Sequence, residues 1–484
     1  MELIFAQSRP GRCACNLPKL DVPAQDCLPD ALRRTKPVAL PEVTELDAVR
    51  HFTNLSRLNF SVDSHFYPLG SCTMKYNPKA HEVIARMPGF TTPHPRLLEI
   101  PGGSDALQGT LEVLYREERF LSELFGFAET TLQPMAGANG EFTGVMLIAA
   151  WCKKQGQSQR KVMLIPDSAH GTNPASAAQA GFICREIKSD AGGNLDLEDL
   201  KAKLGPDVAG LMLTCPNTIG MFNHDVKAIC DLVHQAGGLC YCDGANANAI
   251  VGRVRPGDLG FDVMHVNVHK TFSTPHGGGG PGAGPVCVKE NLQPFLPKPR
   301  IVKNADGTFA LDNNCPESIG HIAPFLGSFA VLLRSCAYML NLGREGMRRV
   351  SENAVLNANY LRVKLAPFFD QQITRDCMHE CVFSATRSKD NGVHALDIAK
   401  ALIDRGFHPP TIYFPLIIPE ALMIEPTETE SKETLDAFIA AMQEIASLAA
   451  SNPEALLQAP LSTPVRRLDE TGAARHPDLA SLED

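Results

Sequence analysis

Short apolar runs alternate with amphipathic stretches through the middle of the chain. Helical periodicity is found at 195–204 and 225–236, between or beside runs of strand-like length at 161–165, 209–214, 238–242 and 262–268. A regular alternation of strands and helices is typical of a mostly parallel sheet with helices on both faces. The pattern therefore predicts an α/β domain in this part of the chain.

The flanking segments have different patterns. Helices are predicted at 109–125 and 142–153, with a glycine-containing turn at 137–140 before the second. Beyond residue 330, the pattern predicts a smaller α/β lobe, with helices at 330–340, 394–405 and 432–449 and strands at 378–385 and 421–424. The first hundred residues are rich in proline, arginine and polar residues, which suits an extended arm lying on another domain or subunit. We predict an arm or cap at 1–100, a large domain at 101–330, and a small domain with the tail at 331–484.

Composition narrows the class of protein. The 484 residues are 44% apolar and 20% charged, with a formal net charge of -9, which suits a soluble metabolic protein and disfavours a general nucleic-acid-binding surface. The 15 cysteines are scattered without a zinc-like spacing, so we expect free thiols and no metal site. No secretory signal is evident at the start, and the apolar run at 145–152 is too short to span a membrane. We therefore expect a cytoplasmic protein without a membrane partner.

Chemically useful side chains follow three of the predicted strands. Asp243 follows the run at 238–242, Lys270 follows 262–268, and His170 lies just after 161–165. Active sites in parallel α/β sheets form at the C-terminal ends of strands, so we expect these three side chains in one crevice. A carboxylate at such a position is costly to bury unless it meets a positive partner.

A glycine-containing turn before a helix adds an anion site. Free N–H groups and the helix dipole at 137–140 would both favour a phosphate, and the glycine run at 277–282 would let backbone approach a bulky ligand. A phosphate cradle, an imidazole, a carboxylate and a lysine together suit pyridoxal phosphate. Lys270 would form the Schiff base, Asp243 would keep the pyridine nitrogen protonated, and His170 would cover the ring. Taken singly, each feature has a common structural explanation, such as a helix cap or a surface lysine; their order along the chain favours the joint interpretation.

Long motifs connect the chain to a known family. They are DSHFYPLGSCTMKYNP at 63–78, PDSAHGTNP at 166–174, DGAN at 243–246, NVHKTFSTPHGGGGPG at 267–282, GFHPPTIYFPL at 406–416 and EPTETESK at 425–432. With these motifs the chain resembles the glycine decarboxylase family, the P-protein of the glycine cleavage system. More narrowly, it resembles subunit 2 of the two-subunit prokaryotic form, from about residue 50 to the C-terminal tail.

The resemblance implies a fold and a set of site residues. The fold is the fold-type I, aspartate-aminotransferase-like fold, with a large mostly parallel-sheet domain and a smaller C-terminal α/β domain. Lys270 is implied as the cofactor lysine, His170 as the ring-stacking residue and Asp243 as the pyridinium partner. Further cofactor neighbours are expected at Ala138 and Asn139 in the phosphate loop and at Thr172, Ala245 and His269. The glycine pocket is expected to include four residues of the N-terminal arm, Tyr67, Cys72, Thr73 and Lys75.

The resemblance also implies an activity and partners. Glycine would lose carbon dioxide, and its aminomethyl group would pass to the lipoyl group of the H-protein. A homologous subunit 1 would complete a heterotetramer of two plus two subunits. The sequence departs from the family pattern at Asn139, Cys215, His321, Ala323 and Ser328. The changes at His321 and Ala323, where the family has arginines, concern subunit contacts or carrier docking more than the chemistry.

Two other functions remain open. The chain could be another fold-type I enzyme, such as an aminotransferase, a serine hydroxymethyltransferase or an amino-acid decarboxylase. An aminotransferase needs an arginine for the substrate carboxylate, and Arg375, Arg387 and Arg405 lie in no motif of that kind. The chain could also be a paralogue that binds the cofactor or a partner without turnover, although the lysine and its ring partners are present.

Overall fold

The computed structural model describes residues 2–23, 25, 27–36 and 38–478, and the chain divides into two compact units. The first unit combines Met1–Ser64 with Ser462–Asp484. It holds the helix α1 (Glu45–Ser56), the short helix α14 (Glu470–Arg475) and the 3-10 turns Ile4–Gln7 and Asp30–Leu32. Helix α1 begins at Thr44, whose hydroxyl accepts a hydrogen bond from the Asp47 N–H. The second unit, His65–Leu461, contains the sheets. The predicted division at residues 100 and 330 stays a prediction.

The large sheet confirms the predicted mostly parallel α/β fold. Seven strands in the described residues follow the order β1-β7-β6-β5-β4-β2-β3, and β7 is the one that runs against the others. The strands are β1 (Glu129–Thr131), β2 (Val162–Pro166), β3 (Ile183–Ile187), β4 (Val208–Thr214), β5 (Leu239–Gly244), β6 (Val263–Val266) and β7 (Val286–Val288). Each of the four predicted apolar runs coincides with a strand. Strand β3 was missed because half of its side chains face solvent.

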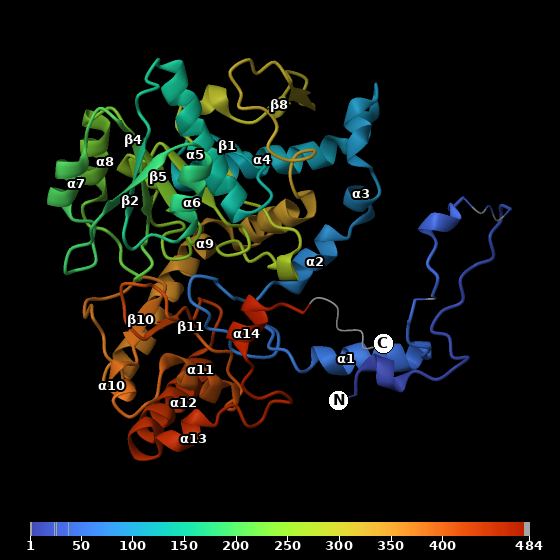
Figure 1. The fold of residues 1–484 in the computed structure, drawn as a ribbon. Coiled ribbons are helices and arrows are strands. Elements are labelled where there is room, and N and C mark those ends of the chain that lie inside the picture. Colours follow the sequence, from blue (N-terminus) through green and yellow to red (C-terminus); the bar gives the residue numbers. More distant parts are fainter. Residues whose placement is uncertain (1, 24, 26, 37, 479–484) are drawn as a thin grey trace. The chain divides into compact units, whose positions relative to one another are not determined.

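Two layers of helices enclose this sheet (Figure 1). Helices α5 (Gly137–Lys154) and α6 (Thr172–Gln179) pack on one face, where they contact Met163 and Ile165 of β2. Helices α4 (Gln108–Phe125), α7 (Leu197–Lys203) and α8 (Val226–Gln235) pack on the other, against Leu164. Alternate residues of one strand thus enter two different cores. Because both faces are covered, the strands are apolar throughout, which is the pattern that predicted a parallel sheet.

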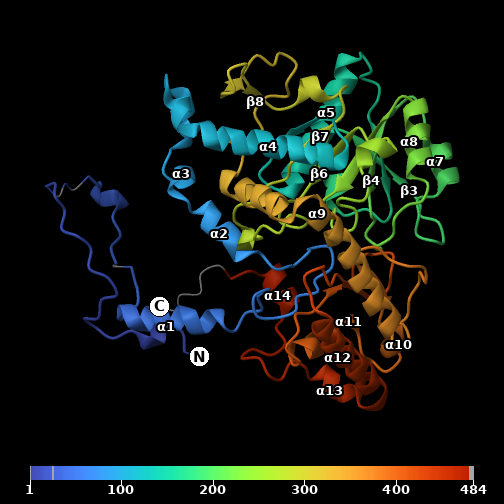
Figure 2. The ribbon, with the colours of Figure 1, turned by 180° about the vertical axis from the view of Figure 1, so that it is seen from behind.

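A long helix connects the large sheet to a second, antiparallel one (Figure 2). Helix α9 (Phe329–Leu365) extends the predicted 330–340 segment and is interrupted at Gly343, where φ is 59°. The small sheet has the order β10-β12-β11, with β10 (Cys381–Ser384), β11 (Thr411–Ile412) and β12 (Ala421–Ile424). Its helices are α10 (Thr386–Lys389), α11 (Ala395–Ile403), α12 (Lys432–Ser451) and α13 (Pro453–Leu457). Strands β10 and β12 and helices α11 and α12 lie where the sequence predicts them.

The remaining elements are short. Helices α2 (Lys79–Ala85) and α3 (Pro88–Thr91) precede α4, and the strands β8 (Arg300–Lys303) and β9 (Phe309–Asp312) form a hairpin. Short 3-10 turns occupy Pro95–Glu99, Gly103–Leu107, Pro256–Leu259, Gly277–Gly279 and Gln293–Phe295. Within the described residues, no helix combines the length and apolar character that a membrane crossing requires.

Close packing between α5 and the sheet gives a test of the fold. A Cβ atom on Gly144 of α5 would lie 2.4 Å from Cε2 of the buried Tyr241. We expect Gly144→Ala to lower the free energy of unfolding by about 1–3 kcal/mol, because the core must shift to admit the methyl group. Denaturant unfolding followed by circular dichroism measures the change.

The matched control is the same substitution at Gly109 of α4. There, no described atom outside the helix backbone lies within 4 Å of the new Cβ, and the residue is exposed. Gly109→Ala should leave stability unchanged or raise it by about 0.5 kcal/mol through the better helix propensity of alanine. Equal effects of the two substitutions would contradict the packing described for α5.

Candidate active site

The C-terminal ends of β2, β5 and β6 surround one cleft of about 150 Å³. His170, Asp243 and Lys270, the three residues predicted from the strand ends, all line it. The wall opposite the large sheet comes from Ser71 of the segment before α2 and from the residues just before β10. Its lining residues include Ser71, Gly137, Ala138, Glu141, His170, Thr172, Asp243, Ala245, His265, Asn267, Lys270, His379 and Glu380.

Asp243 is a buried carboxylate at the end of β5. Its Oδ2 accepts from the Asn173 amide (2.9 Å), and its Oδ1 accepts from the Ala245 N–H (3.0 Å) and lies 3.6 Å from Nε2 of His265. Burial alone would raise the pKa of Asp243; the positive charges of His265 and Lys270 and the two hydrogen bonds outweigh it and hold the pKa below its usual range. Asp243 therefore supplies a fixed negative charge to the cleft.

Lys270 follows β6 and presents an amine with no partner. Its ε-amino group forms no hydrogen bond or ion pair within the described part of the chain, although the side chain is half-buried. Nearby, the buried Oδ1 of Asn267 also lacks a hydrogen bond among described groups, and a Cβ on Gly137 would lie 2.3 Å from it. An unpaired amine beside an unpaired amide suits a site that binds a polar ligand covalently.

His170 and Thr172 form a short polar chain at the end of β2. The Thr172 N–H donates to Nδ1 of His170 (3.2 Å), and the Thr172 hydroxyl donates to Glu141 (2.9 Å). The ring of Phe414 lies 5.6 Å from that of His170. These contacts hold the exposed imidazole in the lining of the cleft.

The predicted turn at 137–140 is wrong in detail: these residues form the first turn of α5, which begins at Gly137. The N-terminus of α5 still offers an anion site, because the first N–H groups of a helix have no partner within the helix. Gly137 and Ala138 line the cleft. Asn139 does not: its Oδ1 accepts from the Met135 N–H (3.0 Å), so the Asn139 side chain stabilises the approach to the helix.

The structure does not bring every predicted residue into the cleft. His269 lies behind Lys270 with its ring 5.0 Å from that of His276, and burial together with the charges of His276 and Lys270 lowers the pKa of His269 to about 3. Tyr67 stacks on His408 at 3.6 Å. Cys72, Thr73 and Lys75 also lie outside the cleft lining, whereas Ala245 lies within it. The glycine-pocket role of the arm residues stays a prediction.

The segment at 71–75 instead binds three glutamates. The Ser71 N–H donates to Glu380 (2.9 Å), and both the N–H and the hydroxyl of Thr73 donate to Glu425 (2.9 and 2.6 Å). Lys75 is buried and donates to Glu428 (2.7 Å). Alternate residues therefore act as donors, and Ser71 and Thr73 adopt φ values of 65° and 53° to present their N–H groups.

Three residues at or beside the cleft were not predicted from the sequence: His379 and Glu380, which line it, and the neighbouring Glu425. All three are buried, with exposed fractions of 1%, 3% and 0%. Glu425 opens the motif at 425–432, so its position carried a signal. No pattern marked Glu380, since its neighbours form an ordinary apolar strand. Cys215, His321, Ala323 and Ser328, the departures from the family pattern, do not line the cleft.

The cleft residues fit a flat cationic ring that carries an anion and an aldehyde. Asp243 offers a negative charge for a ring N–H, the start of α5 offers unpaired N–H groups for a phosphate, and Lys270 offers a free amine. His170 adds an imidazole to the same lining. This fit rests on unpaired polar groups in the cleft, and pyridoxal phosphate has the complementary chemistry.

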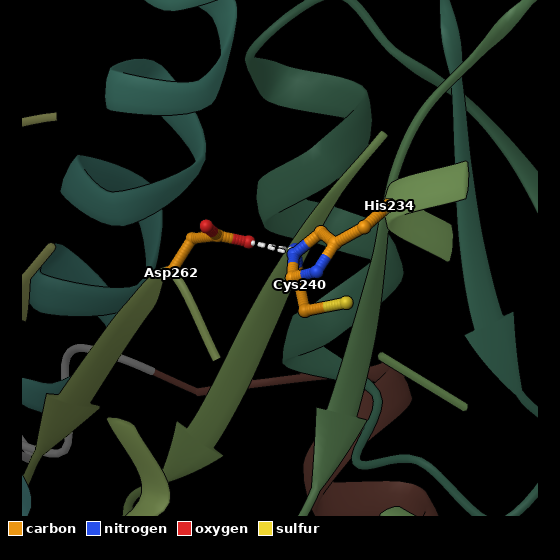
Figure 3. A group of neighbouring side chains, drawn as sticks. All are labelled: His234, Cys240 and Asp262. Carbon is orange, nitrogen blue, oxygen red and sulfur yellow. Dashed lines mark hydrogen bonds and ion pairs between the residues drawn. The ribbon is translucent and has the colours of Figure 1, made fainter. Parts of the chain in front are cut away.

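His234, Cys240 and Asp262 form a second group of side chains, on the side of the sheet that carries α8 (Figure 3). Oδ2 of Asp262 accepts from both Nε2 of His234 (2.8 Å) and the Cys240 N–H (2.7 Å). Burial raises the pKa of the Cys240 thiol, and the nearby Cys230 and Asp262 raise it further, which disfavours the thiolate that a metal would need. The group is best described as an ion pair, and the expected lack of a metal site stays a prediction.

The ion pair should make stability depend on pH. The hydrogen bond with Asp262 raises the pKa of His234 despite partial burial, so its stabilisation is complete below the ordinary histidine pKa and is lost as pH rises through the raised value. We expect His234→Ala to cost about 1 kcal/mol at pH 5.5, after allowance for solvent screening, and less at pH 9. Urea unfolding at both pH values measures this, with the exposed His224→Ala as the control; a pH-independent loss would contradict it.

Lys75 gives a sharper test of the segment at 71–75. Its ammonium also donates to Oδ1 of Asn248 (3.0 Å), the Thr271 carbonyl (2.9 Å) and Tyr338 (3.2 Å). Lys75→Met should cost about 3–5 kcal/mol of unfolding free energy, because it leaves the carboxylate of Glu428 buried without a counter-charge.

The companion variant Lys75→Met with Glu428→Gln removes both charges and should recover part of that loss, as a double-mutant cycle will measure. Additive losses would show that the two groups do not act as a pair.

Comparisons with known proteins agree with this fold. The chain matches the family model for the C-terminal domain of glycine dehydrogenase over residues 350–458 and the class-V aminotransferase model over residues 141–312. It is similar, at 21% identity and a TM-score of 0.71, to a crystal structure of glycine decarboxylase (P-protein) of the glycine cleavage system in inhibitor-bound form, covering 87% of this chain and 93% of that one. An aspartate aminotransferase from Thermus thermophilus has a TM-score of 0.57 at 16% identity, over 79% of this chain and 99% of that one. These likenesses confirm the fold-type I architecture.

Curated relatives cover nearly the whole chain. A probable glycine dehydrogenase (decarboxylating) subunit 2 from Caldanaerobacter subterraneus subsp. tengcongensis is 55% identical over 478 residues, which is 98% of this chain and 97% of the relative. The protein of the same name from Methylococcus capsulatus is 56% identical over 483 residues, with 99% and 98% coverage. The chain therefore belongs to the family of glycine dehydrogenase (decarboxylating) subunit 2, whose motifs the sequence carries.

Proposed function

We propose that this chain binds pyridoxal phosphate, decarboxylates glycine and transfers the aminomethyl group to the lipoyl group of an H-protein. The observation that carries the proposal is the meeting of His170, Asp243 and Lys270 in one cleft. Membership of the family supports the substrate, because its named members are glycine dehydrogenases.

Each cleft residue then has a task. Lys270 would hold the cofactor covalently through its ε-amino group, and the same group would move a proton during turnover. Asp243 stays ionised because its pKa is low, and its carboxylate would keep the ring nitrogen protonated by accepting a hydrogen bond from it. The N–H groups of Gly137 and Ala138 would bind the phosphate, and His170 would stack on the ring. When bound, the cofactor supplies an electron sink for the pair left by departing carbon dioxide.

The charges of the cleft favour decarboxylation over transamination. Among the described residues that line it, none is an arginine. The three arginines considered from the sequence are engaged elsewhere: Arg375 donates to Asn194 (2.8 Å), Arg387 pairs with Asp370 (2.6 Å) and Arg405 pairs with Glu444 (2.7 Å). A substrate carboxylate with no guanidinium partner is less stabilised as an anion. The free-energy cost of its departure as neutral carbon dioxide is therefore lower.

Partners complete the proposal. The name subunit 2 of the relatives implies a subunit 1, and we propose a complex of two copies of each, working in the cytoplasm with the H-protein as carrier. His321 and Ala323, which depart from the family pattern and lie outside the cleft, are candidates for altered contacts with these partners.

The first test is exchange of labelled carbon dioxide into glycine. We expect exchange with this chain, subunit 1 and the H-protein together, and a fall on the order of 10³-fold in Lys270→Ala, because the cofactor loses its attachment and the proton carrier. Lys227→Ala, an exposed lysine on α8, is the control and should match the wild type.

Exchange that survives Lys270→Ala would refute the assignment of the lysine. No exchange in any mixture, with the yellow cofactor bound, would favour a paralogue without turnover. Amino-group transfer from alanine or glutamate would favour an aminotransferase.

A further inference from the structure

Two glutamates, one of which lines the cleft, face each other across the end of the small sheet. Cys381 of β10 pairs with Ile424 of β12, so Glu380 and Glu425 occupy the next position on their strands. One carboxyl oxygen of each and one ring nitrogen of His379 lie within 4.8 Å of one another. Two buried carboxylates this close repel each other strongly when both are charged, so one of them is expected to keep its proton.

Hydrogen bonds decide which glutamate carries the charge. Glu425 accepts from the Thr73 N–H, the Thr73 hydroxyl and the Asn246 amide (2.9, 2.6 and 2.9 Å), an arrangement that suits an ionised carboxylate. Within the described part of the chain, Glu380 accepts a hydrogen bond only from the Ser71 N–H (2.9 Å). Burial is the main reason that the pKa of Glu380 lies well above its usual value, and the charge of Glu425 adds to it. The proton therefore resides on Glu380.

Only the protonated member of the pair reaches the cleft. Glu380 lines it beside Lys270, whereas Glu425 does not. A neutral carboxylic acid is a hydrogen-bond donor in a cleft whose lining contains no arginine. His379 is 1% exposed, and neither of its ring nitrogens forms a hydrogen bond with a described group, although Nε2 lies 3.9 Å from Oε1 of Glu380. Burial lowers the pKa of His379, which favours the neutral ring.

We propose that Glu380 is a substrate-binding residue whose carboxylic acid donates a hydrogen bond to the carboxylate of glycine. This inference rests on the proposed function. A neutral donor orients the carboxylate without neutralising it, and Glu425 behind it opposes the negative charge of the substrate. Because carbon dioxide carries no charge, this environment stabilises the transition state relative to bound glycine.

The proposal predicts how pH affects binding. Above its pKa, Glu380 loses its proton and repels the glycine carboxylate, so affinity should fall as pH rises. The titratable or charged groups that face Glu380 are Glu425 from β12, His379 beside it, Lys270 after β6 and Cys72 from the arm, with Asp243, His265, His170 and Glu141 across the cleft. Burial raises the pKa of the Cys72 thiol, which also titrates at alkaline pH. The wild-type profile alone therefore does not identify Glu380, and variants must.

The decisive experiment measures glycine affinity by calorimetry on the cofactor-loaded complex with subunit 1, from pH 6 to 10. Glu380→Gln keeps a neutral donor of the same shape, so we expect its affinity for glycine to lie within about threefold of wild type at pH 7. The fall in affinity that Glu380 causes at alkaline pH should be absent from this variant. Glu380→Ala should bind glycine about 10- to 100-fold more weakly at pH 7. Glu425→Gln should move that decrease to lower pH, because the charge that keeps Glu380 protonated is gone.

An independent readout is the infrared carbonyl band of a protonated carboxylic acid at pH 7, which should shift when glycine binds and vanish in Glu380→Gln. The matched control is Glu117→Gln on α4: Glu117 is also fully buried, and burial raises its pKa, but it lies outside the cleft. Glu117→Gln should remove a carbonyl band that does not shift when glycine binds, and it should leave the affinity for glycine unchanged.

Several results would overturn the proposal. Wild-type affinity in Glu380→Ala would do so, as would an alkaline decrease that persists unchanged in Glu380→Gln. Tight binding of Zn²⁺ or Mg²⁺ by the wild type but not by Glu380→Gln would instead make the glutamates and His379 a metal site. A loaded complex that binds no glycine would refute the proposed function itself, which distinguishes the two failures.

Discussion

The carboxylate of Glu425 joins three parts of the second unit that are far apart in the sequence. It belongs to the end of β12, it accepts two hydrogen bonds from Thr73, and it accepts a third from Asn246 in the loop after β5. A charge buried with no exposed surface is tolerated only when such donors surround it. The small sheet, the segment at 71–75 and the large sheet must therefore meet at one point, and the cleft is the space beside that point.

Two buried carboxyl groups in this cleft are tuned in opposite directions. Burial works against the charge on both, but His265, Asn173 and the Ala245 N–H surround Asp243 and lower its pKa, whereas Glu380 faces Glu425 and its pKa rises. Asp243 therefore remains an anion that can accept a hydrogen bond from a protonated ring nitrogen, and Glu380 remains an acid that can donate a hydrogen bond. The division of roles follows from neighbours rather than from residue type.

Much of the large domain could be predicted because it rests on local patterns. Runs of apolar residues marked the buried parallel strands, and the strand-end rule brought Asp243, Lys270 and His170 together. The start of α5 was predicted five residues late, since glycines at 137 and 140 suggest a turn. They are helical here for packing reasons, because their Cβ atoms would clash with Asn267 and Gly284.

Features that depend on register between distant segments could not be predicted. The pairing of Glu380 with Glu425 follows from the alignment of β10 and β12, which no periodicity reveals. Likewise, the motif at 63–78 gave no sign that Lys75 would be buried against Glu428, Asn248 and Tyr338. In both cases tertiary contacts decide the environment of a charged group, and sequence shows only its presence.

The alternation of donors at Ser71, Thr73 and Lys75 has a consequence for how the molecule assembles. Shifted by one residue, the segment would present Cys72, Met74 and Tyr76 to Glu380, Glu425 and Glu428. Their backbone N–H groups could replace those of Ser71 and Thr73, but their side chains could not replace the Thr73 hydroxyl or the Lys75 ammonium. Glu425 would then lose a donor, and Glu428 would lose its counter-charge. Correct alignment of this segment also places Ser71 in the wall of the cleft. A chain in which the segment is misaligned would therefore be both incompletely folded and unable to bind ligand.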